Sequence, residues 1–75
     1  MLLPNDTHPE ETVYFNAIFV IRVLNESGEQ HVMEVYSQTK KIRNMSVSMF
    51  SLCLDWLYLL NFLYIDSEGW VKRCS

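Results

Sequence analysis

Apolar positions in this chain form two long runs, separated by a shorter amphipathic stretch. The first run extends from Thr12 to Leu24 and is interrupted only by Asn16 and Arg22. Its β-branched residues favour a strand, whereas its length and the following Gly28 favour a helix with a glycine stop. We predict a helix here. The pattern leaves open a hairpin that turns at this glycine into the next segment.

Residues 29–42 have the pattern of a short amphipathic helix. Val32, Val35 and Tyr36 lie on one side of this helix, and Ile42 lies on the same side about two turns after Val35. Acidic residues come early in the segment and basic residues come late, an order that complements the helix macrodipole. We therefore predict a second helix with a charged outer face.

The longest periodic segment covers residues 47–63, and Ser46 is a suitable N-cap for it. Its polar positions, Ser48, Ser51 and Asp55, recur at spacings of three and four residues, so a helix here has one narrow polar stripe. A helix that is apolar on nearly all sides must be buried on most of them, and a three-helix domain covers only part of it. We therefore predict that this helix contacts a partner.

After this helix, Tyr64 and Ile65 lead into turn residues at 66–69, and alternating residues follow at 70–73, which predicts a short hairpin. The fold class is therefore mainly α: a small winged-helix-like domain of three helices followed by a C-terminal β-hairpin. We assign residues 12–75 to this domain. Residues 1–11 contain both prolines and are predicted to form an extended N-terminal arm.

The chain of 75 residues is long enough for one domain, and 49% of its residues are apolar. A domain of this size buries only about 60% of the surface that its unfolded chain exposes. Part of the apolar surface is therefore expected to remain outside the core, which favours an obligate subunit over a free domain. The candidate partner-binding residues are Leu2, Leu3, Tyr14, Phe15, Trp56, Tyr58 and Trp70.

The net charge of −3 disfavours a stand-alone nucleic-acid binder, which is expected to be basic. Two small basic clusters are nevertheless candidate phosphate contacts, although the simpler interpretation of the cluster at 40–43 is a solvated helix end. The residues are Lys40, Lys41, Arg43, Lys72 and Arg73.

Catalytic and metal-binding patterns are absent from the sequence. His8 and His31 lie in no catalytic motif, and together with Cys53 and Cys74 they do not have the spacing of a zinc site. Spacing alone leaves open a cysteine–histidine pair, but Cys53 lies in an apolar run and is predicted to be a core residue. We expect no enzymatic activity, no cofactor and no disulfide framework, and two glycines are too few for a phosphate-binding loop.

A membrane-spanning helix over residues 49–65 is disfavoured, because Asp55 and Asn61 lie within that stretch. The first residues lack the basic and apolar regions of a secretory signal, so we expect no export. We predict a protein of the reducing cytoplasm.

Three sequence segments resemble a known family: LLPNDTHPE near the start, VYFNAIFVI in the first helix, and LCLDWLYLLNFLYIDSEGWVKRCS at the end. The chain is similar along nearly its whole length to the small middle component of bacterial ABC-three-component systems, which include the Lamassu anti-phage systems. The family commonly has glycine after LYLL, where this chain has Asn61. Asparagine also tolerates left-handed backbone angles.

The resemblance implies a non-catalytic accessory subunit that bridges an ATPase related to SMC or Rad50 and an effector, often a nuclease, in a complex that senses foreign DNA. DNA contact would then be indirect or weak, and no membrane would be involved. The alternative is a winged-helix transcriptional regulator that binds DNA through the basic clusters. A third interpretation is a small membrane peptide.

Overall fold

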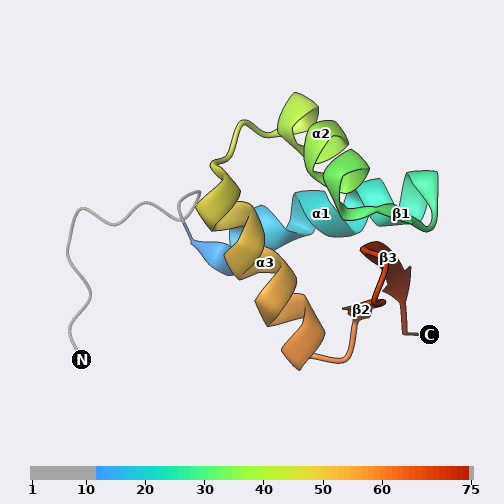
Figure 1. The fold of residues 1–75 in the computed structure, drawn as a ribbon. Helices are drawn as coiled ribbons and strands as arrows, with labels where there is room; N and C mark the ends of the chain where they lie inside the picture. Colours follow the sequence, from blue (N-terminus) through green and yellow to red (C-terminus); the bar gives the residue numbers. More distant parts are fainter. Residues whose placement is uncertain (1–11, 75) are drawn as a thin grey trace.

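Residues 12–74 are described by a computed structural model, in which three helices and a small sheet enclose one core (Figure 1). The elements are α1 (Val13–Ser27), β1 (Gln30–His31), α2 (Val32–Ile42), α3 (Val47–Leu59), β2 (Leu63–Ile65) and β3 (Trp70–Arg73). The predicted order of three helices followed by a C-terminal hairpin is confirmed. The alternative hairpin at Gly28 is wrong, because residues 13–27 are helical.

The first helix begins at a threonine cap and ends at a glycine. The Thr12 hydroxyl accepts a hydrogen bond from the backbone N–H of Phe15 at 3.3 Å. At the other end Gly28 has a φ of 76°, and its N–H donates to the carbonyl of Leu24 at 2.9 Å. The helix thus continues beyond the apolar run, as far as the residue before the glycine, because only there does the backbone leave the helical region.

The start of the second predicted helix is wrong, because Gln30 and His31 form a strand instead. They pair antiparallel with β3, with Gln30 opposite Val71 and His31 opposite Trp70. The strand lies two residues from Gly28, and its partner lies forty residues further along the chain, so local periodicity carries no signal for it. His31 then caps α2, since its Nδ1 accepts from the N–H of Met33 at 3.2 Å.

The third helix begins as predicted and ends earlier than predicted. Ser46 Oγ accepts from the N–H of Met49 at 3.1 Å, which confirms the cap. The helix ends at Leu59, since Asn61 adopts a left-handed φ of 60° that no α-helix accommodates. Leu63, predicted to be helical, instead begins β2 and is fully buried.

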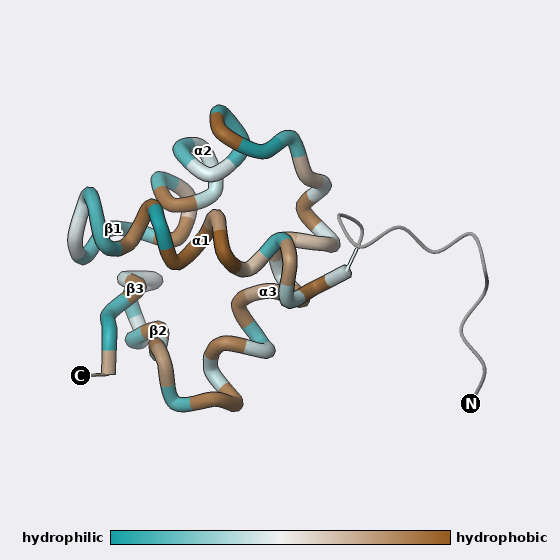
Figure 2. Tube along the Cα trace, turned by 180° about the vertical axis from the view of Figure 1, so that it is seen from behind, coloured by the Kyte–Doolittle hydropathy of each residue, from teal (hydrophilic) through white to brown (hydrophobic). Residues whose placement is uncertain are grey.

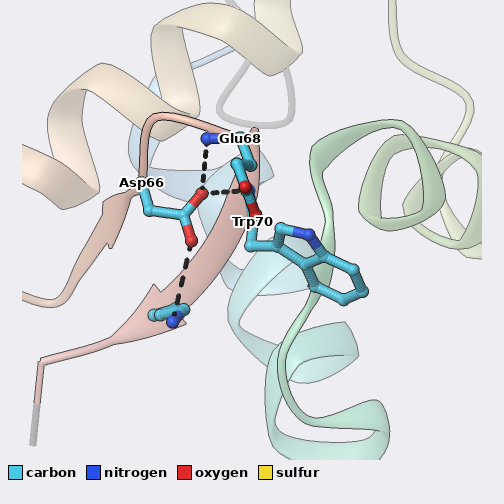
Figure 3. A network of polar contacts seen from close by, with 4 residues as sticks. Asp66, Glu68 and Trp70 are labelled. Carbon is cyan, nitrogen blue, oxygen red and sulfur yellow. Dashed lines mark hydrogen bonds and ion pairs between the residues drawn. The ribbon is translucent and has the colours of Figure 1, made fainter.

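The sheet has the strand order β1–β3–β2 with antiparallel neighbours. Asp66 organises the turn between β2 and β3: its Oδ1 accepts from the N–H groups of Glu68 and Trp70, both at 2.9 Å (Figure 3). Its Oδ2 lies 3.6 Å from the ammonium of Lys72. These contacts, the Trp70 hydrogen bond first, lower the pKa of the Asp66 carboxyl.

The core collects side chains from every helix and from the hairpin. Leu24, Val35 and Leu57 come from the three helices, and Leu63 and Val71 from the sheet. Half-buried residues such as Tyr36 and Phe62 pack against this core. Ile42, predicted to lie on the buried side of α2, is exposed. Each helix thereby buries one side in the core. The angles at which the helices cross determine which of their other apolar residues remain exposed.

Candidate protein-binding surfaces

Helix α3 buries one side and exposes apolar residues on two flanks. Phe50, Cys53 and Leu57 point into the core. The polar positions Ser48 and Asp55 face solvent, as the sequence predicts. Hydrophobic colours prevail along α3 in Figure 2, whereas α2 alternates. The flanks on either side of the polar stripe therefore form two separate apolar surfaces.

The first surface lies where α1 passes α3, and we call it the α1–α3 surface. It consists of Tyr14 and Ile18 from α1 and Leu52, Trp56 and Leu59 from α3, all of them exposed. The Tyr14 and Trp56 rings lie 6.3 Å apart and join the two helices. The other members follow at helical spacings of three and four residues from these rings, so they lie on the same faces. Leu59, 74% exposed, is the most exposed of them.

The second surface is a concave groove between α2 and α3, which we call the α2–α3 groove. Its volume is about 340 Å³. Val32, Met33 and Tyr36 line it from α2, and from α3 come Val47, Phe50, Ser51 and Leu54. The Tyr36 hydroxyl is not available to a ligand as a donor, since it donates to the carbonyl of Met45 at 3.0 Å. The groove is therefore almost entirely apolar, with Ser51 as its free hydroxyl.

Among the predicted partner-binding residues, the structure brings Tyr14 and Trp56 together and separates the others. Phe15 is half-buried on a different side of α1, and its ring lies 5.6 Å from that of Phe19. Tyr58 is exposed one turn beyond the groove residue Leu54.

Trp70 is half-exposed on the sheet, where its ring and that of His31 are nearly perpendicular and their centroids lie 6.3 Å apart. Leu2 and Leu3 lie outside the described residues.

Sequence reasoning missed five exposed members of the two surfaces, which are Ile18, Met33, Val47, Leu52 and Leu59. The spacing of Tyr14 and Ile18 by four residues is a usable signal for the first of them. For the others no local signal exists, because an apolar residue at the border of a helix face is buried or exposed according to the angle of the neighbouring helix.

The candidate phosphate contacts are divided between two parts of the fold, the C-terminal end of α2 and β3 (Figure 1). Arg43 is used internally: its Nε donates to Asn16 Oδ1 at 3.3 Å, and its guanidinium lies 5.3 Å from the ring centre of Phe15. Lys72 is paired with Asp66. Lys40 lies over the ring of Tyr36 at 5.7 Å, which leaves Lys41 and Arg73 exposed without such contacts within the described range.

The buried cysteine has the chemistry of a core residue. Burial raises the pKa of the Cys53 thiol to about 11, so it is protonated at neutral pH and a poor nucleophile. Its Sγ lies 3.5 Å from the carbonyl of Val13.

Within residues 12–74, no three side chains of the metal-binding types gather into a cluster. No helix in this part of the chain has the length and apolar character that a bilayer crossing needs.

These observations define a class: a small α-rich domain with a three-stranded sheet and two exposed apolar surfaces on its helices. The family model for ABC-three component (ABC-3C) system Middle Component 6 matches residues 3–74. The chain belongs to this family. It is therefore an accessory component of an ABC-three component system and a partner of that system's other components. No curated protein and no solved structure gives a significant match.

Proposed function

We propose that this chain is a non-catalytic bridging subunit of a defence complex. It would connect an ATPase related to SMC or Rad50 with an effector, a nuclease, in a Lamassu-type system that acts against phages or plasmids in the cytoplasm. The family match supports membership in a three-component system. The bridging role rests on the structure's own surfaces.

The observation that carries the proposal is the division of exposed apolar residues over two flanks of α3. Tyr14 and Trp56 mark the α1–α3 surface, and Met33 and Val47 mark the α2–α3 groove. Contiguous apolar surface on a small domain is typical of partner contacts. Two such surfaces, separated by the polar stripe of Ser48 and Asp55, allow two partners to bind at once.

The same helix argues against the alternative of a DNA-binding regulator. The element order resembles a winged-helix domain, in which α3 would be the helix presented to the major groove. Here α3 contains no lysine or arginine and carries the carboxylate of Asp55. Without a basic side chain it has nothing to neutralise phosphate or to pair with a guanine edge. We therefore assign α3 to protein contacts and leave DNA to other subunits.

The test is co-expression with the genes encoded beside this chain, tagging only this chain and washing at high salt. We expect a large ATPase and a second protein to co-purify at fixed stoichiometry, because apolar contacts are not screened by salt. Purification of a well-folded chain without partners, together with DNA binding that falls steeply with salt, would instead support the regulator.

A further inference from the structure

The α2–α3 groove has a shape and a charge pattern that restrict what can fill it. Its walls are two neighbouring helices, and its most exposed members are Met33 and Val47, at 72% and 63%. Because nearly all of the lining side chains are apolar and the groove is open to solvent, an apolar ligand that fills it removes apolar surface from water, which favours binding. An apolar helix face presents side chains at the spacing such a groove accepts.

Two charges mark opposite ends of the groove. Lys40 lies over the Tyr36 ring, at the end where α2 passes into α3. Asp55 lies on α3 one turn beyond Ser51, towards the end formed by Met33 and Leu54. Asp55 is exposed and forms no ion pair with any described residue. Lys40 and Asp55 lie beside the lining residues and do not line the groove themselves, so a ligand that extends past both ends of the groove meets a positive charge at one end and a negative charge at the other.

We propose that the α2–α3 groove binds an amphipathic helix of another component of the system, with apolar side chains in the groove and a basic side chain against Asp55. The inference rests on the proposed function, because it takes the occupant from the same complex. The charges also set the direction of the helix. Acidic residues are favoured near a helix N-terminus and basic residues near its C-terminus, so the N-terminus lies near Lys40 and the helix runs parallel to α3.

A second copy of this chain fits the groove less well. In a two-fold contact both copies use the same patch, so that patch would have to hold both the groove and an apolar ridge that matches it. A convex helix from a different chain fills the groove without this requirement.

Two serines on α3 provide a matched test. Ser51 lines the groove, whereas Ser48, three residues earlier and also exposed, does not. In the complex co-expressed with the neighbouring genes, Ser51→Trp should fill the groove and lower recovery of one component at least tenfold. Ser48→Trp should leave recovery unchanged. Both variants should keep the helical circular dichroism of the wild type, since both side chains point into solvent.

Charge and contact add two independent measurements. Asp55→Asn should lower the affinity several-fold and reduce its dependence on salt, because one ion pair is lost. A photo-crosslinking residue at position 33, where the long Met33 side chain lines the groove and is 72% exposed, should label a peptide of that component with apolar residues at helical spacing and a lysine or arginine.

The failure of this proposal is distinguishable from failure of the proposed function. If the wild-type complex forms and Ser51→Trp retains every component, the groove is not the binding site, although the bridging role stands. If the wild type recovers no component, both fail. If Ser51→Trp retains all components but abolishes a dimer of the isolated chain, measured by sedimentation, the occupant is a second copy and the proposal is overturned.

Discussion

At the scale of single residues, Asp66 makes the hairpin turn dependent on pH. Its carboxylate accepts two backbone hydrogen bonds and faces Lys72, and these contacts lower its pKa in the folded protein. A group with a lowered folded pKa stabilises the fold at every pH above its unfolded value of about 3.9. This stabilisation is lost as the pH falls through the folded pKa.

We therefore predict that Asp66→Asn lowers the melting temperature at pH 5–7 and that its difference from wild type disappears as the pH falls below about 4. Thermal unfolding at a series of pH values measures this. Lys72→Met should keep most of the stabilisation that the Asp66 carboxylate provides at pH 5–7, since the main cause of the lowered pKa of Asp66 is the Trp70 hydrogen bond. An equally large loss in Lys72→Met would show that the ion pair dominates instead.

At the scale of elements, two glycines with positive φ have different surroundings. Gly28 ends a helix, and Gly69 lies in the turn of the hairpin. Gly28 has a φ of 76° and nothing within 4 Å of an added Cβ. Gly69 has a φ of 89°, and an added Cβ would lie 2.7 Å from His31 Nε2. The histidine cannot simply move away, because it caps α2 and contacts Trp70.

Gly28→Ala should therefore cost about 1–3 kcal/mol from backbone strain alone. Gly69→Ala should cost more, because the strain is joined by displacement of His31. Urea unfolding of both variants measures the difference. When His31 is also replaced by alanine, the methyl group added by Gly69→Ala has room. The loss of stability caused by Gly69→Ala in that background should therefore fall to that of Gly28→Ala. Gly69→Ala being as stable as Gly28→Ala would contradict this.

At the scale of the whole molecule, two apolar surfaces on one small domain predict that partner contacts separate by mutation. Tyr14 lies on the α1–α3 surface and Met33 on the α2–α3 groove, and both are mostly exposed, so a glutamate at either position leaves the core intact. A carboxylate buried in an apolar interface without a partner costs several kcal/mol.

In the co-expressed complex, Tyr14→Glu should therefore lose one component and Met33→Glu a different one. The stoichiometry of the purified complexes, measured by mass photometry, checks this. Loss of the same component in both variants would mean that the surfaces form one continuous interface, and the bridging arrangement would be wrong.

The order of elements could be predicted because it depends on local signals. Ser46 caps the start of α3, and Gly28 follows the end of α1. Each residue influences only the backbone within one or two helical turns of its own position. Asn61 adopts a left-handed φ of 60°, which asparagine tolerates better than most other residues. The strand at Gln30 could not be predicted, since its strand partner is β3, far along the chain.

The sequence by itself determined the three helices, the terminal hairpin and an excess of apolar residues larger than one small core can bury. Those properties follow from periodicity, caps and composition, which act locally or by simple counting. Only the tertiary structure decided which apolar residues stay exposed. The crossing of α1, α2 and α3 buries Cys53 and Leu57 but leaves Trp56 on one flank of α3 and the groove at Ser51 on the other. Neighbouring residues on one helix have such different surroundings because a packed helix contacts its neighbours along limited stripes.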